Sequence, residues 1–371
     1  MEEALAMATT KPLELSTKLA LARTYFLAGK KPKANALVAE LLPVDQHGLD
    51  KEQEVAFLSD LVAHYTFIGQ DPAAVKLLEA RATELAGHDP IDRRLPPLLE
   101  MLAMLDARKH NRPAMQKHLA QALEVLGNIC VKGSIQYRAS AMRISAILEE
   151  MELPDEAKSM LAALIEEDRR HSYTDELAQE ALRSYIAMCL ELEEPREAIA
   201  ARQRLLEVLS SQGIVDTDEV LREEVLLAVE HARAGEEDAA VRLIRRVEPR
   251  VRALDDDGEQ AIHLLALAEA HQHLKDWISM EREASQAVAI LKQKKREVDL
   301  LADAYTALAY ARRGQGRISE GRKSLDEALR LLEKVYGKDS EEYDEQRECI
   351  EDFPTTPTYS RDRAPVGREK R

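Results

Sequence analysis

Apolar residues recur along most of the chain with the three- and four-residue spacing of amphipathic helices. The stretch from Ala22, ARTYFLAGKKPKANALVAEL, has one apolar stripe, a break at glycine and then a second stripe. The stretch from Val62, VAHYTFIGQDPAAVKLLEAR, repeats this pattern 40 residues later, with tyrosine over tyrosine and glycine over glycine. The pattern predicts pairs of helices joined by short turns, in repeated units.

Further copies follow at offsets of about 40 to 42 residues, and the eighth is GQGRISEGRKSLDEAL from Gly314. We expect a residue near the start of each second helix to be small, because two helices cross closely there; seven copies have alanine or glycine and the seventh in order has Met280. The small residues are Ala34, Ala74, Ala114, Ala157, Ala198, Ala240 and Gly321. Glycines that we expect to end first helices in the left-handed conformation are Gly29, Gly69, Gly235 and Gly316.

These copies resemble tetratricopeptide repeats, which are helix-turn-helix units with a small residue opening the second helix. The resemblance covers roughly residues 15 to 348, and the long period is similar to the repeats of kinesin light chain and of bacterial peptide-sensing regulators. HEAT and armadillo repeats share the period but lack the Gly-x-x-x-x-Ala link. The resemblance implies an all-α, right-handed superhelix of about eight helix pairs in one continuous unit.

The two ends of the chain differ in composition from the repeats. Residues 1–14 form a short polar lead-in, residues 15–353 the expected solenoid, and residues 354–371 a basic tail with three prolines, which we expect to be disordered. The last twelve residues hold five basic and two acidic side chains.

The composition favours a helical chain and argues against one class of partner. Aromatic residues make up 4% and charged residues 32%, with alanine, leucine, glutamate and arginine abundant. The net charge is −16, so the part before the basic end carries −19, which argues against nucleic acid as a partner. The three cysteines are widely spaced, no membrane span or signal peptide is evident, and we expect a cytoplasmic protein.

The segment from Gly316 to Ser324 comes close to the phosphate-binding loop G-x-x-x-x-G-K-[ST]. A true phosphate loop follows a β-strand, whereas the preceding LADAYTALAYARR is predicted helical, and Arg322 stands where lysine belongs. We therefore interpret Gly316 as an inter-helix turn and Gly321 as a packing residue, with no nucleotide cofactor.

The sequence offers few other candidates for catalytic or metal-binding residues. Glu269 and His273 are spaced as a two-ligand metal face, but His271 falls where tyrosine falls in earlier copies, which favours helix packing over a metal site. Cys189 lies on an apolar face and is interpreted as core, and the many carboxylates as solvated surface. We expect no catalytic residues, no metal and no cofactor.

In the resembled family, the first helix of each repeat lines a concave groove. Projecting its inward positions onto this chain gives Arg23, Phe26, Arg183, Arg222, Val229, Arg233, Glu269, Gln272, Tyr310 and Arg313. Arg183, Arg222 and Arg233 could anchor a peptide carboxylate, or could form ion pairs within the protein. The carboxylate clamp of chaperone-binding repeats is not matched, because its positions hold Leu19, Arg23, Ser59 and Ala63.

The resemblance implies a non-catalytic adaptor or scaffold that binds a protein or peptide segment in the groove. A peptide-sensing regulator and an accessory subunit of an enzyme complex are alternatives. The interpretation as a peptide-sensing regulator is less well supported, because such regulators use several groove asparagines and this chain has only Asn35, Asn111 and Asn128. The partner, the process and the oligomeric state stay open.

Overall fold

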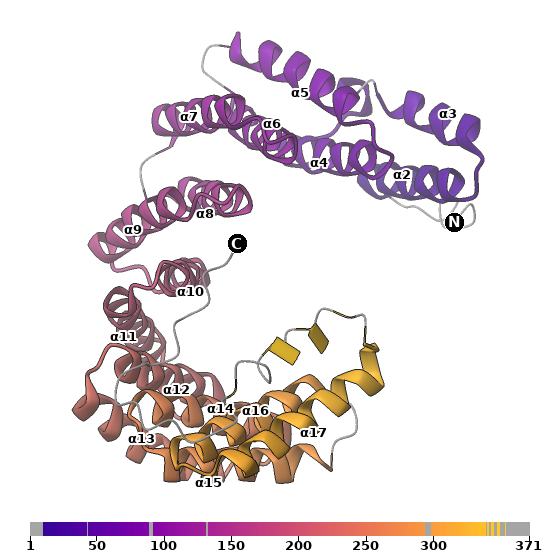
Figure 1. The fold of residues 1–371 in the computed structure, drawn as a ribbon. Helices are drawn as coiled ribbons and strands as arrows, with labels where there is room; N and C mark the ends of the chain where they lie inside the picture. The colour runs from indigo at the N-terminus through magenta and orange to yellow at the C-terminus, as the bar shows by residue number, and fades with distance from the viewer. Residues whose placement is uncertain are drawn as a thin grey trace. The chain divides into compact units, whose positions relative to one another are not determined.

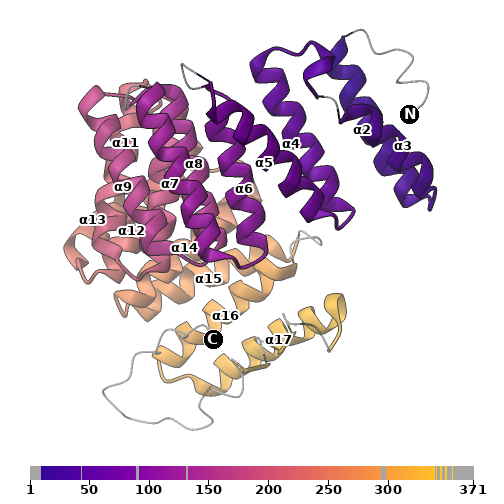
Figure 2. The same ribbon diagram turned by 90° about the horizontal axis from the view of Figure 1, so that it is seen from above.

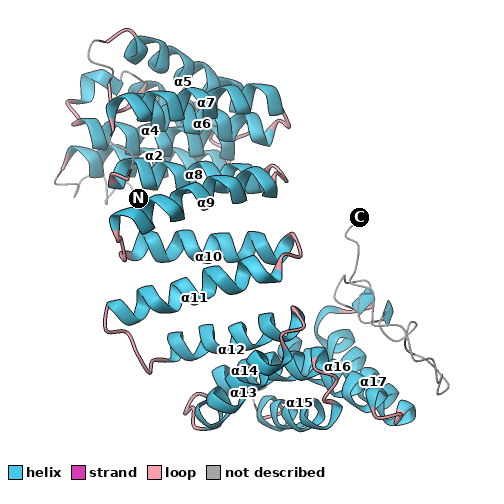
Figure 3. Ribbon diagram, turned by 90° about the vertical axis from the view of Figure 1, so that its left-hand side faces the viewer, coloured by secondary structure: helices cyan, strands magenta, loops and turns pink. Residues whose placement is uncertain are grey.

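The computed structural model describes residues 10–42, 44–88, 92–130, 133–293 and 298–338, together with 340, 343–344, 347–348 and 353. These residues form sixteen α-helices and a short 3-10 helix, with no strand among them (Figure 1, Figure 3). The predicted all-α fold is therefore confirmed, and the handedness of the superhelix stays a prediction. The expected tail, 354–371, lies outside the described residues.

The helices form eight consecutive pairs, as the period predicts. The first helices are α2 (Lys11–Leu27), α4 (Lys51–Phe67), α6 (Leu95–Arg108), α8 (Ile135–Glu150), α10 (Glu176–Glu191), α12 (Asp218–Arg233), α14 (Asp257–His273) and α16 (Val298–Gly314). The second helices are α3 (Lys31–Leu41), α5 (Asp71–Ala86), α7 (Arg112–Ile129), α9 (Pro154–His171), α11 (Pro195–Ser211), α13 (Glu237–Arg252), α15 (Trp277–Leu291) and α17 (Ile318–Tyr336), and the 3-10 helix η1 (Val44–His47) follows α3. The first helix begins at Lys11, inside the stretch 1–14 that we expected as a lead-in.

The chain divides into two compact units, residues 1–188 and 189–371, where one continuous unit was expected. In the first unit, α2, α4, α6 and α8 pack in succession, each also against its own second helix (Figure 1, Figure 2). In the second unit, α12, α14 and α16 pack in succession in the same way. Each unit has its own buried clusters of leucine, valine, isoleucine and alanine.

The small positions lie where the second helix crosses the first, four residues after its N-cap. Ala34, Ala74, Ala157 and Ala198 are at most 1% exposed, as are Ala240 in α13 and Met280 in α15. At Gly321 an added Cβ would come within 2.8 Å of the carbonyl oxygen of Ala309 on α16, so the backbones approach too closely for any side chain. The third copy corrects our register: Asn111 caps α7, so Met115 is the fully buried residue and Ala114 is only partly buried.

One left-handed residue precedes the N-cap of every second helix. The four predicted glycines have φ between 69° and 79°. The other four repeats hold residues with side chains at φ between 53° and 58°, which the sequence pattern missed: His110, Glu152, Glu193 and Lys275. In each turn the next backbone N–H donates to the carbonyl five residues earlier, as from Glu236 to His231 at 2.8 Å, which satisfies the end of the first helix.

Candidate binding face of the first helices

The first helices of the second unit present one row of partly open side chains. On α14 and α16 these residues are spaced by seven and then three, and on α12 they are eleven apart, which places them on one side of each helix. We call this row the first-helix face, and it consists of Arg222, Arg233, Ile262, Glu269, Gln272, Asp303, Tyr310 and Arg313. Of these, Ile262 and Asp303 were not predicted, although they occupy the register position of Arg222 in the two following repeats.

Local sequence fixes where two of these helices begin. The hydroxyl of Thr217 accepts a hydrogen bond from the backbone N–H of Val220, and this N-cap starts α12. The carboxylate of Asp256 accepts from Gly258 and Glu259 at 2.7 and 3.1 Å and starts α14. Because both caps satisfy otherwise open backbone donors, they stabilise the starts of α12 and α14, near which Arg222 and Glu259 lie.

Each of the two arginines on α12 meets a carboxylate from α14. Arg233 lies 2.5 Å from Glu269, and Arg222 lies 4.0 Å from Glu259. All four side chains remain between 39% and 52% exposed, so water reaches both ion pairs. The structure thus brings Arg233 and Glu269 together as direct partners, and places Arg222 at the far end of the same helix.

The carboxylates of this face have shifted acidities. The neighbouring His273 and then Arg233 hold the pKa of Glu269 below its ordinary value, because both stabilise the charged carboxylate. Desolvation by the surrounding protein, and then the charge of Asp299, raise the pKa of Asp303. The face therefore carries both a stabilised and a destabilised negative charge.

Tyr310 and Arg313 on α16 contact a residue that follows the last helix. Phe353 is 2% exposed, and its ring makes an edge contact with Tyr310 at 6.0 Å between centroids. The guanidinium of Arg313 lies 5.6 Å from the centre of the Phe353 ring and 6.0 Å from that of Tyr310. Gln272 is half-buried on α14.

The remaining projected residues are distributed over both units. Val229 is only 4% exposed, so it belongs to the core and not to the groove as we expected. In the first unit, Arg23 donates to the backbone carbonyl of Asp60 at 3.2 Å. Phe26 makes an edge contact with the half-exposed Phe67 at 6.3 Å, and Arg183 is half-buried on α10.

Several carboxylates that we expected on the solvated surface are buried instead, among them Glu54, Glu100, Asp168, Glu223, Glu230 and Glu283. Arg202 on α11, itself buried, pairs with Glu223 and Glu230 of α12, and Arg138 on α8 pairs with Asp168 of α9. Burial raises the pKa of Glu230, and Arg202 opposes that shift. These pairs join neighbouring helices inside the protein and are not open to a ligand.

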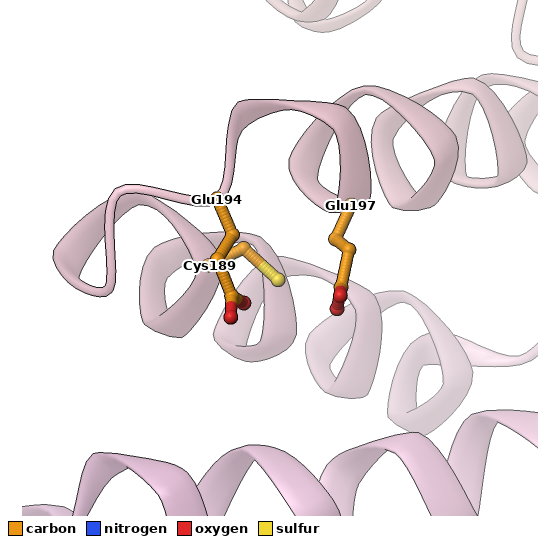
Figure 4. A group of neighbouring side chains, drawn as sticks. All are labelled: Cys189, Glu194 and Glu197. Atoms are coloured by element: carbon orange, nitrogen blue, oxygen red, sulfur yellow. The ribbon is translucent and has the colours of Figure 1, made fainter.

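The candidate metal ligands of the described residues fall in two places. His273 lies 3.8 Å from Glu269, while His263 and His271 are buried, which agrees with the packing role expected for His271. Cys189 at the end of α10 is fully buried, as predicted, and lies within 4.8 Å of the carboxylates of Glu194 and Glu197 (Figure 4). This group has three donors, and no fourth histidine, cysteine or carboxylate of the described chain joins it.

The segment that resembles a phosphate loop joins two helices. Helix α16 precedes it, Gly316 has φ 79°, and α17 begins at Ile318. Both glycines therefore have the structural roles that the repeat pattern predicts. None of the described helices is both long and apolar enough to cross a membrane.

Comparison with known proteins shows which solved structures are similar to this chain. No protein-family model matches the chain, and no curated protein matches it in sequence. Solved structures that are similar include the apo form of RapI, which is 14% identical over 88% of this chain and 86% of RapI with a TM-score of 0.50. A tetratricopeptide repeat protein from Parabacteroides merdae is 15% identical over 80% of this chain and 97% of its own, with a TM-score of 0.43. Aspartyl phosphate phosphatase F from Bacillus subtilis is 11% identical over 97% and 98% of the two chains, with a TM-score of 0.46. The chain has the all-α helix-pair fold of tetratricopeptide-type repeat proteins.

Proposed function

We propose that the chain is a non-catalytic, cytoplasmic adaptor or scaffold whose first-helix face holds an extended segment of a protein or peptide partner. The observation that carries this proposal is the pair of exposed arginines on α12, each with an exposed carboxylate partner from α14. An exposed ion pair contributes only about 0 to 1 kcal/mol, so a carboxylate of a ligand can replace Glu259 or Glu269 at little cost.

The surrounding residues suit a peptide better than a small polar solute. The side chain of Ile262 is 45% exposed at the register position of Arg222 in the next repeat, and offers apolar contact area beside the charges. A guanidinium can donate two parallel hydrogen bonds to one carboxylate, which fixes the direction of a bound segment. Gln272 can donate to and accept from a peptide backbone.

The test is affinity purification of the tagged full-length chain from its native cell extract, with mass spectrometry of the bound proteins. One or two stoichiometric proteins support the scaffold. An enzyme as the stoichiometric partner supports the accessory subunit instead, and a partnerless chain that a peptide fraction stabilises supports the sensor.

The arginines are tested by replacing Arg183, Arg222 and Arg233 together with alanine. We expect the affinity for the captured partner to fall at least tenfold, about 1.4 kcal/mol. Arg242→Ala with Arg245→Ala, two exposed arginines of α13, is the matched control and leaves affinity unchanged. Unchanged affinity in the triple variant would overturn the role of these anchors.

A further inference from the structure

The eighth repeat contains a site built around an aromatic ring. Phe353 packs against Ala309 and Leu325 of α16 and α17, with Tyr310 and Ile318 alongside. It is 2% exposed although it stands 17 positions after Tyr336, where α17 ends. The burial of so large a side chain beyond the last repeat shows that α16 and α17 form a receptacle for it.

The receptacle fits a ring in three separate ways. Tyr310 meets Phe353 edge-on at an interplanar angle of 64°, a favoured aromatic geometry. Arg313 brings its guanidinium to 5.6 Å from the ring centre, within cation–π range. Gly321 leaves the space open, since a Cβ there would lie 2.8 Å from the Cζ atom of Phe353.

Two of these groups, Tyr310 and Arg313, belong to the first-helix face. The chain therefore covers part of its own face with a phenylalanine of its C-terminal segment. We propose that this receptacle is an aromatic-anchor site, filled by Phe353 within the chain, and that a partner segment carrying a phenylalanine takes its place. The inference deepens the proposed function and rests on it for the existence of a partner.

An internal occupant competes strongly, because the connecting chain keeps it at a millimolar effective concentration. Removing the ring should therefore open the site to the same sequence added from outside. The probe is a fluorescent peptide of residues 346–358, QRECIEDFPTTPT, made with serine in place of Cys349. Its binding to the full-length chain is followed by fluorescence anisotropy.

We expect the F353A chain to bind this peptide at least about tenfold more tightly than the unaltered chain does. Adding Arg313→Ala to F353A should lower the affinity for the peptide at least about threefold. A peptide with alanine in place of the phenylalanine should not bind. Phe67→Ala, which removes an exposed phenylalanine of the first unit, is the matched control and should behave like the unaltered chain.

Equal peptide affinity for the F353A and unaltered chains, or no binding to an F353A chain of normal helical content, overturns the proposal. If F353A loses helical circular dichroism, Phe353→Leu keeps an apolar side chain without a ring, and the same two comparisons apply to it. The affinity of the captured partner for the triple arginine variant tests the arginine anchors, whereas peptide binding to the F353A chain tests the receptacle on α16 and α17. The aromatic-anchor site and the proposed function can therefore fail independently.

Discussion

The guanidinium of Arg233 on α12 lies 2.5 Å from a carboxylate oxygen of Glu269 on α14, with both side chains partly open to water. Such a pair should contribute little to folding, because solvent screens both charges. We expect a double-mutant cycle of Arg233→Ala and Glu269→Ala, followed by urea denaturation, to give a coupling free energy below about 1 kcal/mol. A coupling above about 3 kcal/mol would mean that the pair holds the repeats together and is not available to a ligand.

The buried arginine of α11 should behave in the opposite way. Arg202→Ala leaves Glu223 and Glu230 buried without their partner, which costs about 3 to 5 kcal/mol. Arg204→Ala on the same helix removes a more exposed pair with Glu207 and should cost less than about 1 kcal/mol. Hydrogen exchange of the α11 and α12 amides measures both, and equal protection in the two variants would contradict the prediction.

Replacing glycine with alanine should change the free energy of unfolding in opposite directions at two positions, because their backbone conformations differ. Gly235→Ala forces a side chain into φ 76° and should destabilise the sixth repeat by about 1 to 2 kcal/mol. Gly127→Ala, inside α7 where an added Cβ meets nothing within 4 Å, should stabilise by about 0.5 to 1 kcal/mol. Amide exchange in α13 and α7 reports each change, and a destabilising Gly127→Ala would show that propensity does not decide there.

Three buried histidines make stability fall in mild acid. Burial lowers the pKa of His64, His263 and His271 from the ordinary value of 6.5. Below pH 6.5 the unfolded chain therefore binds more protons than the folded chain, and the free energy of unfolding falls as the pH falls. This loss begins near pH 6.5 and ends when the pH reaches the lowered pKa of the folded state. Above pH 6.5 the histidines are neutral in both states and the full stability is present.

Each of these histidines should contribute up to about 1.4 kcal/mol per pH unit within that window. Thermal unfolding between pH 7.5 and 5.5 measures the slope, which His271→Gln should reduce. A slope that is the same in both proteins would show that His271 is not the titrating group.

The repeat period predicted the helix pairs well, because the apolar stripes and the close helix crossing constrain residue type at fixed spacing. It failed in the third copy, where Met115 and not Ala114 fills the crossing. It also missed the left-handed His110 and Lys275, because the prediction of this conformation rested on glycine alone.

The side-chain partnerships were harder to predict than the helices. Arg202 and Glu230 are 28 positions apart on helices rich in charge, so sequence alone cannot separate a buried pair from a solvated surface. Phe353 stood at the edge of the expected solenoid, and its burial depends on the shape that Gly321 leaves open. The exposed row on α12, α14 and α16 could be projected because register is inherited from the repeat, whereas the pairing of Arg233 with Glu269 could not.

Within each unit, the stronger contacts between described helices join each helix to the next one or to the one after it. Because few contacts join helices that are far apart in the sequence, each repeat resists a stretching force through its contacts with its neighbours. Pulled from its two ends, it should lengthen in a series of small steps, each the release of one or two helix pairs, and shorten again by the same steps when the force is removed. A partner attached along several repeats would then act as a clamp against extension.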